Sequence, residues 1–274
     1  MKRNFVFGLL CLFFASFVGE GSYRFIKNDI FGKNEHIEYG VSFGFLNAGV
    51  ATVDVSPKHF LLNNRICYKI DVAGRTTGIG GGIVRVQDTW RTYLDTAAFV
   101  CHRSFRHIEE GSYRREELTD FKPLTNKGIM KFEEYGEKDP ISKRKKGKKE
   151  FKIPDNVQDM VSGYYYLRTL NFDKMQIGEV VMISGMLEDK SYDLKIKYKG
   201  KDIIKTKFGK IHAHKIVPIM PDNQMFSGEN SVRFWVSDDK NRVPVRVEAD
   251  MFIGKIVVEL KDYANLKHKF NFKQ

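Results

Sequence analysis

Alternating apolar and polar residues along most of the chain predict β-strands. In the clearest case, residues 243–251, Val, Val, Val, Ala and Met alternate with Pro, Arg, Glu and Asp. Residues 192–198 likewise place Tyr, Leu, Ile and Tyr on one face and Asp and Lys on the other. A period of two brings every second side chain to the same face of a strand, and clean alternation is typical of an antiparallel sheet with one covered face.

Other stretches predict further strands with less regular patterns. They cover residues 39–45, 50–55, 65–73, 84–94, 99–109, 113–118, 128–135, 209–218 and 255–263. Glycine-containing turns separate several of them, at residues 46–49, 78–82 and 252–254. The glycine cluster at 78–82 joins two strands and has no helix after it, so we interpret it as a hairpin loop and not as a phosphate-binding loop.

One segment after Pro154 has helical spacing instead. Its apolar positions would form one stripe: Val157, Met160, Val161, Tyr164 and Leu167. Asp155 is a good N-cap, and Gln158 three residues later completes a capping-box pattern. We therefore predict a helix over residues 155–170.

Two charged residues of this predicted helix, Asp159 and Arg168, lie nine residues apart. That spacing is about half a turn out of phase, so the two side chains cannot pair with each other. We expect each to hold the helix to a different part of the sheet.

The strands and the single helix together predict a mainly β fold. We expect a large curved antiparallel sheet, or open β-barrel, with the helix packed on its concave side. A β-sandwich of two packed sheets is the alternative.

The N-terminal residues have the pattern of a secretory signal peptide. Lys2 and Arg3 precede an apolar stretch over residues 5–18, and small residues follow it. The apolar stretch is about 14 residues long, whereas a membrane-spanning helix needs about 20. We therefore predict a cleaved signal over residues 1–19 and a single β-rich domain over residues 20–274.

Two alternatives concern this N-terminus. An uncleaved anchor is one of them, and lipidation at Cys11 is the other. A lipoprotein signal has a small residue directly before its cysteine, whereas Leu10 stands there. We therefore expect an exported, periplasmic protein, with association with the outer membrane as an open alternative.

The positive charge is concentrated in one run. Residues 143–152 hold seven Lys or Arg and one Glu, so about half of the formal charge of +12 lies there. The run has no apolar periodicity, and we predict a solvated basic loop over residues 142–153. Contact of the run with anionic lipid or lipopolysaccharide is the alternative. Nucleic acid is not an expected partner, because the rest of the chain carries no comparable basic surface.

The mature chain has two cysteines, Cys67 and Cys101, both in predicted strands. An oxidising compartment would permit a disulfide, but buried free thiols are the simpler interpretation. His102 would point to the opposite face of its strand from Cys101, so the two do not suggest a nucleophile and its base.

Three stretches resemble a known family. They are residues 39–45 followed by Ala48 and Gly49, residues 157–168, and residues 234–245 followed by Gly254 and Leu260. In this order the sequence resembles the exported bacterial family called domain of unknown function 3108, over nearly all of the mature chain. The resemblance implies an envelope location and a β-rich fold. It supplies no catalytic residues.

Motifs for metal binding are weak. His212 and His214 would lie on one strand face, a geometry found in metal sites, but the sequence shows no third ligand. Residues 238–242 lack the alternating oxygen ligands of a calcium loop. We predict a hairpin loop there, with Asp239 and Arg242 paired across it, and neither a metal nor a cofactor.

Hydrolytic motifs are equally weak. No GxSxG nucleophile elbow is predicted, because the one such sequence, residues 40–44, lies in a predicted strand. Ser162 lies inside the predicted helix and not at a strained turn. Paired carboxylates for glycoside hydrolysis stay open, because their separation depends on the fold.

Aromatic residues suggest the remaining candidate site. Tyr164, Tyr165 and Tyr166 of the helix could meet aromatic residues of the sheet, namely Phe43, Phe45, Trp90 and Trp235. These side chains would either fill the core or line a cleft for a hydrophobic ligand.

We therefore favour a non-enzymatic periplasmic binding or chaperone-like protein for a hydrophobic or lipid-like ligand. One alternative is an envelope hydrolase acting on glycan or lipid. Another is a structural protein that docks onto envelope partners through residues 143–152.

Overall fold

The computed structural model describes residues 22–77, 85–219, 230–252 and 254–273. The predicted signal peptide over residues 1–19, the glycine cluster at 78–82 and Ile253 in the last predicted turn lie outside these residues.

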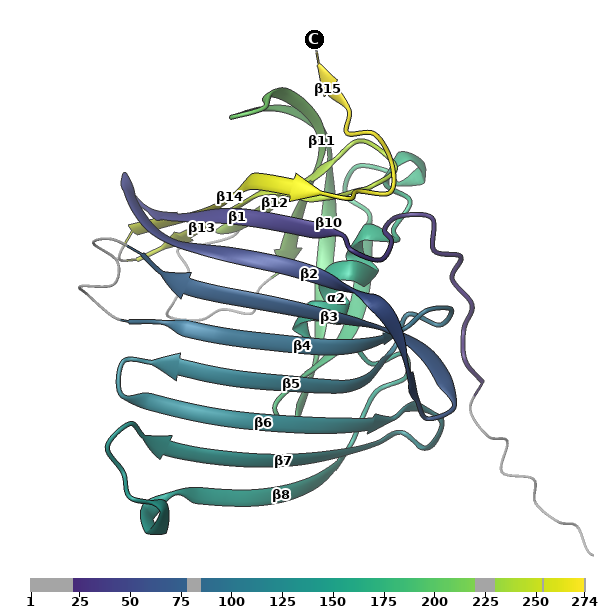
Figure 1. The fold of residues 1–274 in the computed structure, drawn as a ribbon. Helices are drawn as coiled ribbons and strands as arrows, with labels where there is room; N and C mark the ends of the chain where they lie inside the picture. The colour runs from purple at the N-terminus through teal and green to yellow at the C-terminus, as the bar shows by residue number, and fades with distance from the viewer. Residues whose placement is uncertain (1–21, 78–84, 220–229, 253, 274) are drawn as a thin grey trace, which may run out of the picture.

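One antiparallel sheet forms the body of the described chain (Figure 1). Its strands, in spatial order, are β8 (Lys145–Lys152), β7 (Lys127–Gly136), β6 (Tyr113–Lys122), β5 (Cys101–Glu110), β4 (Gln87–Asp95), β3 (Arg65–Thr76), β2 (Leu46–Leu62), β1 (His36–Phe43), β14 (Gly254–Ala264), β13 (Pro244–Met251), β12 (Val232–Ser237), β11 (Gly209–Ile219), β10 (Lys190–Thr206) and β9 (Val180–Leu187). A short strand, β15 (Phe272–Lys273), pairs with β11 outside this order. The sheet does not close, because β8 and β9 remain as its edges, and this confirms the predicted open antiparallel sheet.

The helix α2 (Met160–Arg168) lies on the inner side of the sheet, behind β2 to β4 in Figure 1. Its Val161 and Tyr165 belong to the main apolar core, together with residues of β1 to β4. Its Leu167 packs with Ile183 and Ile196 in a second cluster against β9 and β10. The helix thus fills the space between the two halves of the curved sheet. Three short 3₁₀ helices, η1 (Pro123–Thr125), η2 (Ile141–Lys143) and η3 (Phe172–Lys174), complete the helical elements of the described residues.

The N-cap of the helix lies four residues after the predicted one. Asp159, and not Asp155, is the N-cap, and its carboxylate accepts the Ser162 N–H at 2.6 Å. The residues before it are extended, because the Cys101 N–H donates to the Val157 carbonyl and the Gln158 N–H donates to the Ser184 carbonyl. This extended segment joins β5 to β9, and such pairing competes with helix formation.

The predicted apolar stripe also shifts with the helix start. Met160 is 51% exposed, whereas Tyr165, which the predicted stripe omitted, is fully buried. Val157 is buried too, but as part of the extended segment. The stripe was therefore partly wrong, because residues 157 and 158 follow the pairing of the sheet.

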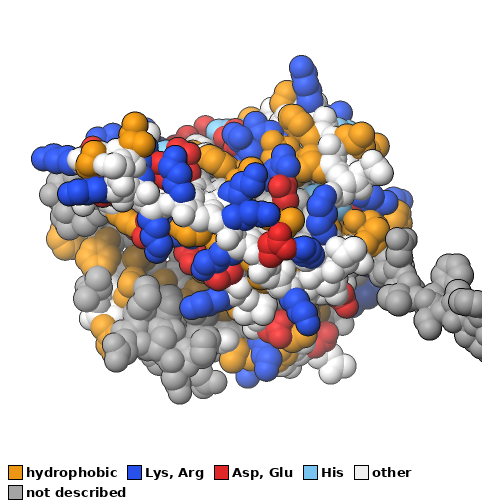
Figure 2. Space-filling view, turned by 90° about the horizontal axis from the view of Figure 1, so that it is seen from below, with side chains coloured by type: hydrophobic (Ala, Val, Ile, Leu, Met, Phe, Trp, Pro, Cys, Tyr) orange, Lys and Arg blue, Asp and Glu red, His pale blue; other side chains and the backbone are white. Residues whose placement is uncertain are grey.

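The basic run forms a strand and not the predicted loop. Residues 145–152 are β8, which pairs with β7 along its whole length. Gly147 and Phe151 hold it to β7, since the ring of Phe132 covers Gly147 and the ring of Phe151 covers Gly128. The lysines of β8 stay exposed, and such charges protect a free sheet edge against pairing with another chain. In Figure 2, seen from below, Lys and Arg side chains spread over the surface with Asp and Glu between them.

Candidate functional site: a charged pocket on the concave face

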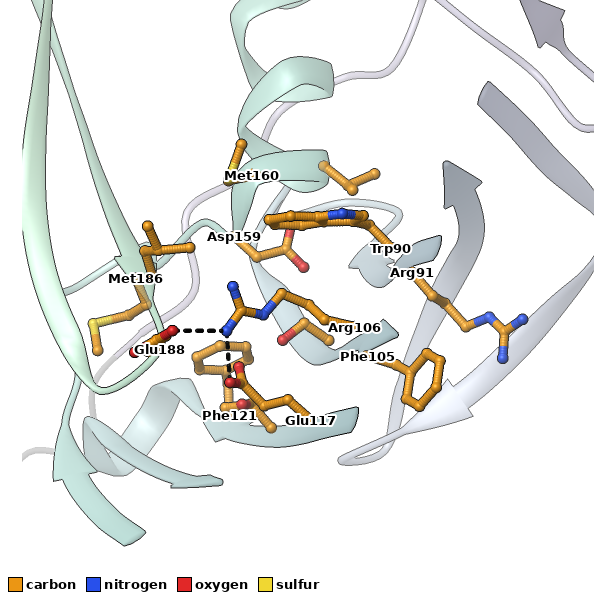
Figure 3. A pocket seen from close by; sticks show the side chains of 14 residues that line it. Trp90, Arg91, Phe105, Arg106, Glu117, Phe121, Asp159, Met160, Met186 and Glu188 are labelled. Carbon is orange, nitrogen blue, oxygen red and sulfur yellow. Dashed lines mark hydrogen bonds and ion pairs between the residues drawn. The ribbon is translucent and has the colours of Figure 1, made fainter. Parts of the chain in front are cut away.

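A narrow pocket lies where the β9–β10 hairpin approaches the concave face of β4, β5 and β6 (Figure 3). The tip of this hairpin is formed by Glu188 and Asp189. The start of α2 forms its third wall. The free volume is about 20 Å³, which is room for about one water molecule. The pocket is therefore nearly closed as the structure stands.

Strand register places the polar residues of the pocket in one row. Trp90 of β4 pairs with Arg106 of β5, and Arg106 pairs with Glu117 of β6. Residues directly opposite each other in an antiparallel sheet point to the same face. All three side chains therefore face the helix and the hairpin tip.

An arginine–glutamate network occupies the centre of the pocket. Arg106 Nη2 lies 2.6 Å from a Glu117 oxygen and 3.3 Å from a Glu188 oxygen. Arg115 Nη2 lies 3.0 Å from Glu117, and its Nη1 lies 2.7 Å from Glu134. Burial alone would lower the pKa of Arg115, but the Glu117 carboxylate outweighs this effect and the pKa is raised. The Arg115 guanidinium therefore stays charged.

Arg106 retains unused hydrogen-bonding capacity. Its side chain is 12% exposed, and its Nε is buried without a hydrogen-bond partner among the described residues. The Trp90 ring lies 5.2 Å from the guanidinium carbon, within range of a cation–π contact. A buried donor without a partner costs free energy, so the Nε is a position where a ligand or a water could bind.

Apolar side chains form the rest of the pocket. Phe121 and Met186 are buried, while Met160 and Leu187 are partly exposed at the rim. Figure 3 shows Met160 on the helix above Trp90, and Met186 and Glu188 on the hairpin side. The pocket thus combines an apolar rim with a charged centre.

Ion pairs fasten the hairpin tip to the sheet. Glu188 reaches Arg106 at 3.3 Å and Arg115 at 4.0 Å. The neighbouring Asp189 accepts a bond of 2.8 Å from Lys149 of β8. Glu188 is 45% exposed at its side chain, so solvent already reaches this contact.

The aromatic residues proposed from the sequence do not form one site. Tyr165 lies in the core, where its hydroxyl donates to Glu35 at 3.0 Å. The hydroxyl of Tyr164 is 2.8 Å from that of Tyr39. Tyr166 lies beneath Arg24, with the guanidinium carbon 4.2 Å from its ring centroid.

The aromatic residues of the sheet are equally dispersed. Trp235 is buried, and its indole N–H donates to Asp202 at 2.8 Å. Phe45 is 95% exposed at the β1–β2 turn, and Phe43 packs on Gly254. Of the seven, Trp90 alone lines the pocket described here.

A buried ion pair fixes the C-terminal end of the helix. The sequence did not suggest the partner of Arg168 in this pair, which is Glu35. Arg168 and Glu35 are both fully buried and form two bonds of 2.7 and 2.9 Å. Arg168 Nε also donates to the Asn241 carbonyl. Burial would lower the pKa of Arg168, but Glu35 outweighs this effect and raises it. Glu35 carries no local sequence signal for this role.

The other helix end is held by different strands. Asp159 accepts a weak hydrogen bond from the Cys101 thiol of β5 at 3.4 Å, and burial raises its pKa. Asp159 and Arg168 therefore contact different parts of the fold.

The loop after β12 is a hairpin, but its predicted side-chain pair is not the contact that forms it. Asp239 Oδ1 accepts the backbone N–H groups of Asn241 and Arg242. The Arg242 guanidinium donates instead to the Arg168 carbonyl at 3.4 Å.

His214, Asp173 and Asp238 form a cluster that could hold a metal ion. His212 is not part of this cluster. His214 Nε2 is 2.9 Å from Asp238. The Lys201 ammonium, however, binds both Asp173 and Asp238, at 3.0 and 2.8 Å. A lysine therefore already supplies the positive charge that these carboxylates attract.

The candidate nucleophiles are unreactive in this structure. Cys67 and Cys101 are buried free thiols, so they form no disulfide. Burial raises the pKa of Cys67 to about 12 and that of Cys101 well above its usual value. The Ser162 Oγ is engaged in the helix cap. A thiol with a raised pKa is mostly protonated at neutral pH and is a poor nucleophile.

Comparison with known proteins gives a family. The model of a protein family of unknown function, DUF3108, matches residues 38–261. The chain belongs to the DUF3108 family. No curated protein matches the chain significantly.

Two solved structures are similar to the DUF3108 chain. A β-barrel-like protein of domain of unknown function DUF1849 from Brucella abortus has a TM-score of 0.52 at 10% identity, covering 89% of this chain and 99% of its own. A Bacteroides fragilis protein, described as a "putative exported protein with YmcC-like fold", has a TM-score of 0.34 at 6% identity, with 89% and 100% covered. The first supports the β-barrel-like fold alone.

None of the helices in the described residues has the length and apolar character to cross a membrane.

Proposed function

We propose that this DUF3108 protein is an exported envelope protein that binds a hydrophobic or lipid-like ligand without chemical conversion. The ligand site is the pocket between the concave face and the β9–β10 hairpin. One observation carries the proposal. Met160 and Leu187 are 51% and 41% exposed at the rim of a pocket that Trp90 also lines. Apolar side chains at a concave polar-and-apolar site are typical of ligand pockets.

Binding requires the hairpin tip to move. A free volume of about 20 Å³ holds no acyl chain. The tip is fastened by partly exposed ion pairs of Glu188 and Asp189, and such pairs contribute roughly 0–1 kcal/mol each. Displacing residues 188 and 189 alone, with Met186 kept in its buried cluster, is therefore inexpensive compared with burying an acyl chain, which contributes about 0.8 kcal/mol per buried CH₂.

The envelope location rests on the predicted signal over residues 1–19, and we propose a periplasmic protein on that basis. A chaperone-like role for a lipidated or acylated partner fits the same site. The hydrolase alternative gains no support, because both pocket glutamates, Glu117 and Glu188, are bound to arginine.

Contact with an anionic envelope surface is a second candidate. Lys146, Lys148 and Lys152 of the edge strand β8 are exposed, and clustered lysines attract anionic lipid head groups. Neutralising these three residues should weaken sedimentation with anionic vesicles while leaving ligand uptake unchanged. Equal sedimentation of the variant would remove this candidate.

Ligand uptake by the mature protein tests the main proposal. We expect a fluorescent fatty acid to bind, and native mass spectrometry after mild purification to show co-purified lipid. Met160→Gln with Leu187→Gln should weaken uptake roughly tenfold, because about 1.4 kcal/mol of apolar contact is lost at the rim. Ile203→Gln is the matched control, since Ile203 is 47% exposed on β10 and does not line the pocket. No uptake and no co-purified lipid would overturn the proposal.

A further inference from the structure

The contacts of the hairpin tip are electrostatically matched to the sheet beneath it. The sheet side of these contacts carries three cations, Arg106, Arg115 and Lys149. It carries two carboxylates, Glu117 and Glu134. The tip supplies two more, from Glu188 and Asp189. When the tip moves away, the sheet side is left with an excess of positive charge.

Of the two carboxylates on Arg106, Glu188 is the one more easily replaced. Glu117 lies 2.6 Å from Arg106 and is only 4% exposed, whereas Glu188 lies 3.3 Å away and is 45% exposed. Glu117 is also bound by Arg115 at 3.0 Å. The sheet therefore keeps Glu117 in place, and Glu188 occupies a position on Arg106 that solvent and solutes can reach.

Arg106 can bind a larger anion than it now does. Its buried Nε has no partner among the described residues, although a guanidinium can bind a carboxylate or phosphate through two parallel N–H bonds. Trp90 covers one side of the group. The exposed Met160 and Leu187 lie at the rim of the same pocket.

We propose that the ligand is an anionic amphiphile whose carboxylate or phosphate head group replaces the Glu188 carboxylate on Arg106 and Arg115. Its apolar part lies along Trp90, Met160 and Leu187. The hairpin tip is then an internal substitute for the head group, and ligand binding releases it. This inference rests on the proposed function, because it assigns the polar end of the same ligand.

Probes that differ only in the head group test the inference on the full mature protein. A fluorescent fatty acid, its methyl ester and its alcohol are titrated in parallel. We expect the acid to bind at least about fivefold more tightly than the ester, because a charge-assisted bidentate bond is lost in the ester. Equal affinities for all three probes would overturn the head-group assignment and leave the proposed function standing. Binding of none of them would overturn both.

Substitution of the tip glutamate sharpens the test. Glu188→Gln should raise the affinity for the acid severalfold and leave the affinity for the ester nearly unchanged, because it removes the competing carboxylate. Glu116→Gln is the matched control. Glu116 is 49% exposed at its side chain and stands next to Glu117 on β6, so it points to the other face. The same gain in both variants, or a gain for both probes, would contradict replacement of Glu188.

Substitution of Arg106 should weaken the preference for the acid, whereas Glu188→Gln should strengthen it. Arg106→Gln, combined with Glu117→Gln so that no buried carboxylate loses its partner, should reduce the preference for the acid to near unity. Arg103→Gln, on the outer face of the same strand, is the control. Circular dichroism and thermal unfolding check that the variants fold. Arg106→Gln alone, which leaves Glu117 paired with Arg115, replaces the double variant if that one does not. An unchanged acid preference in a folded Arg106 variant would overturn the proposal.

Inorganic phosphate distinguishes an amphiphile from a free anion. Phosphate should displace the fluorescent fatty acid only at concentrations far above those of a competing unlabelled fatty acid, because it makes no apolar contact. Competition at similar concentrations would show a site for free anions and contradict the assignment of an amphiphile.

Discussion

Two arginine–glutamate networks in this protein differ in how completely the fold encloses them. At the end of α2, Arg168 and Glu35 are both fully buried and form two hydrogen bonds with each other. On the concave face, Arg106 shares Glu117 with Arg115 and reaches an exposed Glu188, while its Nε has no partner among the described residues.

The difference indicates different roles for the two networks. Arg168 also donates to the Asn241 carbonyl, and Tyr165 donates to Glu35, so this closed network fastens the helix to the segment before β1 and to the hairpin after β12. The open network has spare donors and an exchangeable partner. A closed network stabilises one structure, whereas an open one can exchange a protein carboxylate for a ligand.

Breaking the closed network should have the largest effect. Glu35→Gln leaves the Arg168 charge buried without its counter-ion, and such a loss costs roughly 3–5 kcal/mol of unfolding free energy. Glu117→Gln is the matched change in the open network. There Arg106 keeps Glu188 and Arg115 keeps Glu134, so we expect about 1–3 kcal/mol. Urea unfolding of both variants measures the difference, and equal losses would contradict the distinction.

The second largest effect on stability is expected at alkaline pH, which should weaken the closed network. Burial raises the pKa of Tyr164 to about 12 and the pKa values of Tyr39 and Tyr165 well above the usual 10. The unfolded chain loses these protons as pH rises through about 10, while the folded protein keeps them. Unfolding is therefore favoured progressively above that pH, and stability is unaffected by these groups below it.

Urea midpoints between pH 8 and about 11 measure this dependence. Tyr164→Phe should make the loss of stability with pH shallower, since one of the shifted groups is removed. Tyr113→Phe, at a partly exposed position on β6, serves as the control. An identical pH slope in wild type and Tyr164→Phe would contradict the prediction.

The smallest effect on stability is expected at the hairpin tip. Lys149→Gln removes the pair with Asp189, whose partners are 49% and 29% exposed, so the loss should be within about 1 kcal/mol. Amide hydrogen exchange should nevertheless rise at residues 187–190, because the tip opens more often. Exchange in α2 is the internal reference. Faster exchange in both segments would indicate general loosening of the fold instead.

Part of the fold could be predicted from local patterns. The alternation at residues 243–251 corresponds to β13 (Pro244–Met251), and the helical spacing after Pro154 contains α2. β9 (Val180–Leu187) was missed, because its nearly continuous apolar run has no alternation. β8 was missed for the opposite reason, since Gly147 and Phe151 are its only inward packing signals in a run of lysines.

The candidate site could be predicted far less well. Trp90 was named as an aromatic candidate, but Arg106, Glu117 and Glu188 were not, because charged residues on strands and in turns ordinarily face solvent. Their meeting depends on the register of β4, β5 and β6 and on the fold of the hairpin. No spacing within any one of these segments carries that information.

The sequence by itself determined the class of structure and the existence of one helix, because periods of two and of three to four residues are local properties of a strand and a helix. The tertiary structure alone decided where the helix starts, that the basic run is a strand, and which charges are enclosed. Arg168 and Glu35 stand 133 residues apart. Their pairing is a consequence of how the curved sheet brings distant segments together, and such long-range contacts leave no periodic trace in the chain.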